Sequence, residues 1–189
     1  MTATTRPAPQ GSTTAPSGAV TTGGSPTGRG AVAYVWAGLR LALGWVFLWA
    51  FLDKMFGWGF NTASENAWVN GGSPTEGFLT FGTSGPFEGF YQSFAGAAWA
   101  DFMFMFGLAG LGVALMAGIA LRIAAVGGTV LMLMMWSASL PPDTNPFMTS
   151  HLIYAGLFIA FALVYAGDTL GFGRAWSRMP LVQRLPWLR

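Results

Sequence analysis

Residues 99–140 read WADFMFMFGLAGLGVALMAGIALRIAAVGGTVLMLMMWSASL, and Arg122 divides them into apolar runs at 99–121 and 123–140. Each run is about as long as the roughly 20 helical residues needed to cross a bilayer. Because lipid offers no hydrogen-bond partners to backbone polar groups, both runs are predicted to be transmembrane helices. The near-absent loop at Arg122 then makes them a tight antiparallel pair.

Two further apolar runs, residues 31–52 and 146–166, lie on either side of this pair. The chain is 53% hydrophobic and only 8% charged, which leaves too few charges to coat a soluble domain of 189 residues. The first run begins at residue 31 and lacks a small-residue cleavage pattern behind it, so it is not a cleavable signal peptide. The sequence predicts an all-α integral membrane protein, an antiparallel bundle of four transmembrane helices.

The charged residues separate by connection. Basic residues lie before the first run, between the second and third, or after the fourth: Arg6, Arg29, Arg122, Arg174, Arg178, Arg184 and Arg189. Acidic residues fill the other two connections: Asp53, Glu65, Glu76, Glu88, Asp101 and Asp143. Since basic residues near span ends are retained in the cytoplasm, we expect a multi-pass protein of a prokaryotic plasma membrane with both termini cytoplasmic. The arginines serve this orientation, and nothing points to nucleic acid.

The two tails differ in composition. Residues 1–30 are mostly Thr, Pro, Gly, Ser and Ala, which predicts a disordered cytoplasmic tail. Residues 168–189 interleave arginine with Phe, Trp and Leu, which predicts a basic amphipathic cytoplasmic tail. This tail either lies on an anionic inner leaflet or is a plain positive-inside anchor. Residues 31–167 then form the four-helix membrane domain.

The connection at 53–98 is long, aromatic and rich in helix start signals. Residues 73–76, SPTE, have the capping-box pattern, in which Ser73 accepts from the backbone N–H of Glu76, and predict a short helix through Phe78. Residues 85–88, GPFE, have the pattern of a second helix start. Aromatic residues at helical spacing follow it and predict one aromatic face: Phe87, Phe90, Tyr91 and Phe94. We expect this loop to cap the extracytoplasmic end of the bundle.

Three further aromatic residues and a series of small residues add to this picture. Trp68, Phe81 and Trp99 belong either to an interfacial aromatic belt or to a lid that contacts a ligand. Small residues recur in the second and third runs and predict a close approach of helices: Gly107, Gly110, Ala114, Gly118, Gly127 and Gly128.

Four charged residues near the spans are candidates for a site. Arg40 lies mid-run, where a bare charge costs on the order of 3 kcal/mol or more, so it must snorkel or find a partner. Asp53 and Lys54 follow directly at the end of the first run. They form either a local ion pair or part of a functional site. Asp101 begins the second run, where helix-dipole complementarity alone explains it adequately.

The fourth run carries the only histidine, His151. Asn145 and Pro146 have the pattern of a cap and first helical position, which places His151 just below the outer surface. A membrane histidine suits proton exchange near neutral pH, although hydrogen-bonded packing is the alternative. Tyr154 follows as a candidate cofactor contact. One histidine and no cysteine predict neither haem nor a metal site.

Several of these features together resemble the DoxX/DoxD family. The resemblance covers residues 35–166 and rests on RLALGWVFLWAFLDK at 40–54, Trp68, GGSPTEGFL at 71–79, and the stretch from Asn145 to His151. DoxD is the membrane subunit of thiosulfate:quinone oxidoreductase. The resemblance therefore implies quinone-linked electron transfer at the outer membrane face, or membership of an envelope redox complex. A small companion subunit would have to supply any sulfur chemistry, because this chain has no cysteine.

The sequence thus predicts a quinone-interacting membrane redox subunit. A quinone pocket needs apolar walls, aromatic surfaces and a proton-exchanging group near the interface. The candidate catalytic residues are His151, Asp53 and Lys54. The candidate cofactor-binding residues are Arg40, Trp68, Phe78, Asp101 and Tyr154. The expected partners are membrane lipid, quinone, and a companion subunit or respiratory complex.

Two other classes of protein are alternatives to this hypothesis. A non-catalytic scaffold or accessory subunit of an envelope or respiratory complex would explain the small residues, the capped loop and the tail without any chemistry. A small transporter is disfavoured, because no span has an interior glycine-proline break flanked by repeated polar residues.

Overall fold

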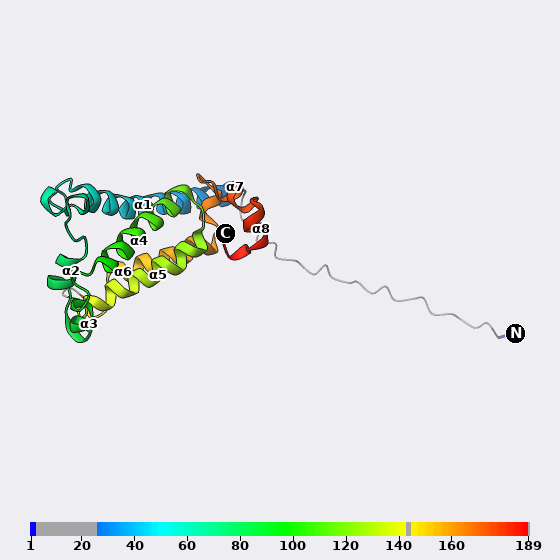
Figure 1. The fold of residues 1–189 in the computed structure, drawn as a ribbon. Helices are drawn as coiled ribbons and strands as arrows, with labels where there is room; N and C mark the ends of the chain where they lie inside the picture. The colour runs from blue at the N-terminus through cyan, green and yellow to red at the C-terminus, as the bar shows by residue number, and fades with distance from the viewer. Residues whose placement is uncertain (3–25, 143–144, 189) are drawn as a thin grey trace.

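The computed structural model describes residues 1–2, 26–142 and 145–188, and these form helices and short helical turns (Figure 1). The predicted N-terminal tail lies largely outside the described residues, as do Arg6, Asp143 and Arg189. The described residues contain no β-strand, only an isolated bridge between Ser84 and Ser139. The four longest helices are α1 (Pro26–Phe56), α4 (Ala98–Ala117), α5 (Leu121–Ala138) and α6 (Ser150–Leu163). Of the described helices, α1, α4 and α5 are long and apolar enough to span a membrane.

The long helices pack as two pairs, α1 along α4 and α5 along α6, and contacts between α4 and α5 join the pairs. We call one end of this arrangement the loop end; it carries residues 57–97 with α2 (Glu76–Phe81) and α3 (Glu88–Gln92). The opposite tail end carries residues 164–188 with α7 (Gly173–Ser177) and α8 (Pro180–Arg184). The acids of the first connection and the arginines that follow α4 and α6 therefore lie at opposite ends of the molecule.

Several helix boundaries differ from the prediction. α1 extends beyond the predicted run of 31–52 at both ends, so residues 26–30, which were predicted to be disordered, belong to this helix. The turn between α4 and α5 comes at Gly118, which ends α4 with a left-handed φ of 71°, so Arg122 belongs to the first turn of α5. The expectation that the fourth helix starts at Pro146 is wrong, since α6 begins at Ser150. Asn145 Oδ1 does accept backbone N–H bonds, but it closes a separate turn at Phe147 and Met148.

α1 and α4 approach closely at two glycines that were not predicted from the sequence, Gly44 and Gly112. A Cβ on Gly112 would lie 2.7 Å from the backbone nitrogen of Leu48, and one on Gly44 would lie 2.9 Å from Leu115 Cβ. Gly110, a member of the predicted stripe, is exposed, and a Cβ there would meet nothing within 4 Å. The stripe is predicted to join α4 and α5, but these two helices pack less closely than α1 with α4 or α5 with α6, and a Cβ on Gly107 would come only within 3.8 Å of Leu131. A residue's direction around the helix, and not its size alone, decides which neighbour it meets.

In the second pair, α5 and α6 approach closely at Gly128 of α5, because the ring of Phe158 of α6 packs directly against this glycine. Phe158 also contacts Phe47 of α1, with ring centroids 5.3 Å apart, and so connects the two pairs. The buried core between the helices is formed by apolar side chains: Leu43, Phe47, Met105, Leu108, Leu111, Leu115, Leu121, Met132, Phe158 and Phe161. This core holds the loop end in place.

Candidate functional site

Arg40 is completely buried in α1 and has its guanidinium surrounded by backbone carbonyls. It donates to five of them, those of Leu115, Met116, Ala166, Thr169 and Leu170. The Nε distance to the Ala166 oxygen is 3.1 Å and the Nη2 distance to the Leu170 oxygen is 2.8 Å. Arg40 therefore finds partners in the interior and does not snorkel.

The position of these acceptors gives Arg40 a structural function. They belong to the last turn of α4 and to segment 166–170, so Arg40 joins α1 to both at the tail end. The last carbonyls of a helix have no donor within the helix and carry the negative end of its dipole. A buried guanidinium with five N–H donors satisfies several of them at once. Arg40 lines neither of the two cavities of the loop end described below.

Asp53 is also buried, and both of its carboxylate oxygens hold the chain that follows α1. Oδ1 accepts the backbone N–H of Phe60 at 3.3 Å, and Oδ2 accepts that of Asn61 at 2.9 Å. The carboxylate thus turns the chain at the end of α1. Asp53 is a predicted catalytic residue, but both of its carboxylate oxygens are engaged in these structural hydrogen bonds.

Asp101, in the first turn of α4, fastens the segment that leads into α2. Its Oδ1 accepts three hydrogen bonds: from Ser73 Oγ at 2.9 Å, from Thr75 N at 3.0 Å and from Thr75 Oγ1 at 2.6 Å. Among the described residues no donor reaches Oδ2. Next to this contact, Ser73 Oγ accepts the N–H of Glu76 at 3.1 Å, the bond that the capping-box pattern predicts. The helix itself starts at Glu76.

The remainder of the loop is fastened to the end of α5. The Ser84 backbone N–H donates to the Ala138 carbonyl at 2.9 Å, and its hydroxyl donates to the Leu140 carbonyl at 3.1 Å. The hydroxyls of Tyr91 and Ser137 lie 2.7 Å apart. The loop therefore bridges the loop ends of α4 and α5 and places α2 and α3 across the space between them.

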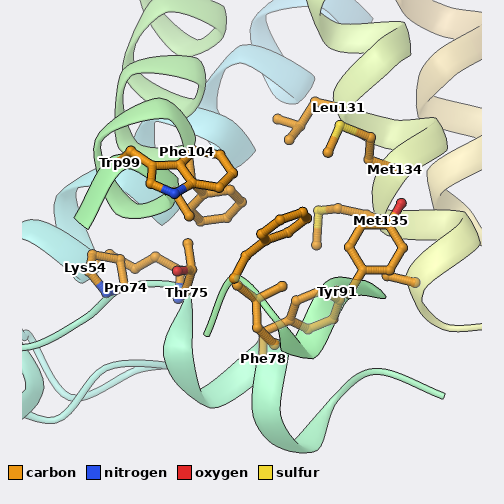
Figure 2. A pocket seen from close by; sticks show the side chains of 14 residues that line it. Lys54, Pro74, Thr75, Phe78, Tyr91, Trp99, Phe104, Leu131, Met134 and Met135 are labelled. Carbon is orange, nitrogen blue, oxygen red and sulfur yellow. The ribbon is translucent and has the colours of Figure 1, made fainter. Parts of the chain in front are cut away.

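This bridge encloses a cavity of about 270 Å³, which we call the apolar pocket. Figure 2 shows Trp99 and Phe104 on one side of it, Phe78 and Tyr91 on another, and Lys54 with Thr75 at its edge. The remaining walls come from apolar side chains of the loop, α4 and α5: Leu79, Phe94, Ala100, Leu131, Met134, Met135 and Ala138. Aromatic rings and methionines therefore form most of the lining.

The rim of the apolar pocket lies on the outer surface of the helices. Trp99 of α4 is 55% exposed and Met134 of α5 is 47% exposed, although both line the pocket. In a bilayer this surface would face the hydrocarbon or its interface.

A second and larger cavity, of about 970 Å³, lies on the other side of α2 and is called the polar chamber here. Its lining is mainly polar side chains and loop backbone, including Asn61, Thr62, Asn66, Trp68, Ser73, Glu76, Thr80 and Asp101. Lys54, Pro74 and Phe78 line both cavities. The two cavities therefore meet at Lys54, with the Phe78 side chain between them.

Lys54 is half-buried, and its charge is attracted by that of Asp53. Its ammonium makes no hydrogen bond to any residue that the structure describes. An ammonium carries three N–H donors, so those of Lys54 are available to water in the polar chamber or to a ligand in the apolar pocket. This is the one predicted catalytic residue that lines the apolar pocket.

The other predicted site residues lie in several places. Trp68 lines the polar chamber and packs edge-on against Phe102, with centroids 5.0 Å apart. Tyr154 packs against Phe47 in the core and lines neither cavity. His151 also lies outside both linings, and its Nδ1 is 3.3 Å from Thr149 Oγ1. The structure thus brings together Lys54, Trp68, Phe78 and Asp101.

The predicted aromatic face after residue 85 is divided in the structure, because α3 ends at Gln92. Tyr91 and Phe94 line the apolar pocket, whereas Phe87 and Phe90 are 47% and 59% exposed. The pocket walls on α5, formed by Leu131, Met134 and Met135, could not be predicted from the sequence. Methionine and leucine give an apolar helix the same sequence pattern whether they face lipid, the protein core or a ligand.

Comparison of the chain with protein-family models, with curated proteins and with solved structures finds no match. The class of protein therefore rests on the fold and the site alone. These define an α-helical protein with membrane-type helices and a paired apolar and polar cavity at one end.

Replacing Asp101 by alanine is expected to release the segment before α2, because three donors lose their acceptor. Each buried donor left unsatisfied costs about 1–3 kcal/mol. Hydrogen–deuterium exchange of peptides covering residues 71–82 should accelerate by roughly tenfold or more. Asp101→Asn is the matched control, since its amide oxygen can still accept and should preserve most of the protection. Equal exchange in Asp101→Ala and the unmodified protein would contradict this assignment.

Proposed function

We propose that the protein is a four-span membrane protein in which α6 is the fourth span. The 14 residues of α6 extend about 21 Å, short of a bilayer core of roughly 30 Å, and the segments on either side would complete the crossing. The packing of α6 along α5 and its apolar sequence support this. With arginines at the tail end and acids at the loop end, the positive-inside rule supports a cytoplasmic position for both termini, and the proposed location is a prokaryotic plasma membrane.

We propose further that the apolar pocket binds the ring of a membrane quinone. The observation that carries this proposal is the aromatic and methionine lining around about 270 Å³, with the Lys54 ammonium at its edge. That volume is near the lower limit of ligand pockets, which suits a ring while the isoprenoid tail stays in lipid. A quinone carbonyl is a hydrogen-bond acceptor, and Lys54 is the charged donor at the pocket.

The polar chamber supports a redox role for such a site. A quinone takes up two protons when it is reduced, so its ring needs a route to water. The chamber reaches Lys54, and the buried Asp101 carboxylate contributes to its lining. His151, outside both cavities, would act only through other residues. Phe78, which lines both cavities, and Trp68, which lines the polar chamber, would lie between the quinone ring and the water in the chamber.

The resemblance to the DoxX/DoxD family supports the same proposal. A DoxD-like subunit of a thiosulfate:quinone oxidoreductase would bring the quinone site, and a companion subunit would supply the sulfur chemistry that a chain without cysteine cannot perform. We therefore place this protein, as a hypothesis, on the quinone side of a membrane redox complex.

Quinone binding is tested by titrating a short-chain benzoquinone into the protein in nanodiscs and following quenching of tryptophan fluorescence. Saturable quenching is expected, and Trp99→Phe should remove most of it because Trp99 lines the pocket. Lys54→Met should weaken binding about tenfold, the loss of one hydrogen bond from a charged donor. His151→Gln is the control and should bind as the unmodified protein does.

A second substitution makes this test independent of Lys54. Leu131→Trp adds a large ring inside the pocket and should abolish saturable quenching while the helical circular dichroism is retained. Unchanged affinity in Leu131→Trp would show that the quinone binds elsewhere. Absence of saturable binding to the unmodified protein would rule out the quinone proposal.

A scaffold or accessory subunit is the second candidate function. Exposed aromatic rings gather at the loop end of α1, where Phe56, Trp58 and Phe60 are 47%, 49% and 71% exposed and contact one another or Trp49. Such a surface suits either the membrane interface or another membrane protein. Purification in mild detergent followed by mass spectrometry separates the two functions. Co-purified quinone favours the redox subunit, and a stoichiometric protein partner without quinone favours the scaffold.

A further inference from the structure

The chain after α6 folds into a small cap beneath the tail end of the helices. The Phe172 N–H donates to the Ala117 carbonyl at 2.8 Å, and Arg122 Nη1 donates to the Pro186 carbonyl at 2.9 Å. Within the cap, Trp176 Nε1 donates to the Leu188 carbonyl at 2.8 Å. The cap is therefore held at both ends, with its first residues on α4 and its last turn on α5.

The free surface of this cap is strongly apolar. Only Val182 of the larger aliphatic side chains in the cap is buried, at 3% exposure. Six other large apolar side chains, from just before α7 to the last turn, are 40–69% exposed: Leu170, Phe172, Met179, Leu181, Leu185 and Trp187. A folded cap that leaves so much apolar surface uncovered needs a partner that is not water.

The same surface carries three exposed arginines. Arg174, Arg178 and Arg184 are exposed, and their guanidinium groups make no hydrogen bond or ion pair with the residues that the structure describes. Asp168, which is half-buried at the start of the cap, is the only acidic residue near them in sequence, because residues 169–189 contain no Asp or Glu. The partner must therefore accept apolar side chains and supply anions within the same surface.

We propose that the cap of residues 169–188 is an interfacial platform that binds anionic phospholipid headgroups, with its apolar side chains inserted among the acyl chains. Charge complementarity and apolar insertion together distinguish an anionic leaflet from a protein partner, and the cap lies at the end of the bundle where a leaflet must be. A plain positive-inside anchor requires the arginines but neither a folded cap nor exposed leucine, phenylalanine and tryptophan. This inference does not depend on the quinone site.

The test compares lipid retention in two forms of the whole protein. Each form is reconstituted in nanodiscs of phosphatidylcholine with an equal share of phosphatidylglycerol, extracted in mild detergent, and analysed by native mass spectrometry. The unmodified protein should retain phosphatidylglycerol preferentially, and the triple variant Arg174→Gln, Arg178→Gln, Arg184→Gln should lose that preference by about threefold or more. The preference should also fall as salt is raised.

The matched control is Glu65→Gln with Glu88→Gln, which changes exposed charges at the loop end and should leave the preference unaltered. Insertion is measured separately by the quenching of tryptophan fluorescence with brominated phosphatidylcholine. The bromine should quench the emission of Trp187, so the quenched component should be missing in Trp187→Phe. Equal retention of both lipids by the unmodified protein, or a preference that survives the triple substitution, would overturn the proposal. So would Trp187 fluorescence insensitive to brominated lipid.

Discussion

Replacing Arg40 by methionine is expected to lower the free energy of unfolding by roughly 3 kcal/mol or more. The methionine side chain fills much of the same space but donates no hydrogen bond, so two buried and three part-buried carbonyls lose their donor. The relief of an uncompensated buried charge offsets part of this loss. We expect the loss to dominate, because each carbonyl left unsatisfied costs about 1–3 kcal/mol.

The measurement is a titration with sodium dodecyl sulfate in mixed micelles, followed by far-ultraviolet circular dichroism. Arg40→Lys should be intermediate, because an ammonium keeps the charge but cannot reach five carbonyls with the fixed fork of a guanidinium. Arg184→Met removes an exposed arginine and should change the midpoint little. If Arg40→Met and Arg184→Met unfold at the same detergent fraction, the assignment of Arg40 as the tail-end clamp is wrong.

Replacing Gly112 by alanine is expected to lower the free energy of unfolding by about 1–3 kcal/mol. The added Cβ would lie 2.7 Å from the backbone nitrogen of Leu48, and a helix backbone cannot move aside as a flexible side chain can. α1 and α4 must then separate along their length. The same detergent titration measures the loss.

Gly110→Ala is the matched control for this prediction. It adds the same methyl group to the same helix two residues away, where nothing lies within 4 Å. Alanine is the better helix former, so Gly110→Ala should be neutral or more stable by up to about 1 kcal/mol. Equal effects of the two substitutions would show that helix propensity, and not the contact with α1, decides the outcome.

Much of the fold follows from local sequence. The runs that overlap α1, α4 and α5 are predicted by length and apolar composition alone, and the separation of acids from arginines predicts the two ends of the molecule. The start of the fourth helix could not be predicted in this way. Asn145 and Pro146 have the residue types of a helix start, but the Asn145 side chain closes a turn of its own.

The candidate site could be predicted only in part. Lys54 and Phe78 are conspicuous in sequence, one as a lone cation and the other in a capped helix, and both line the apolar pocket. Asp101 could be noticed but not interpreted, because its role depends on Ser73 and Thr75 across the loop. His151 is the most conspicuous residue in the sequence, yet it lies outside both cavities.

The amino-acid sequence by itself determined that this is a helical chain of membrane type, with its charges divided between two ends. Those properties depend on the composition of each segment and on the local hydrogen-bonding needs of the backbone. The tertiary structure alone decided that Arg40 clamps the tail end, that Gly112 carries the helix contact, and that Lys54 stands between two cavities. Each of these depends on which residues distant in sequence meet in space, and an apolar helix presents nearly equivalent side chains in every direction.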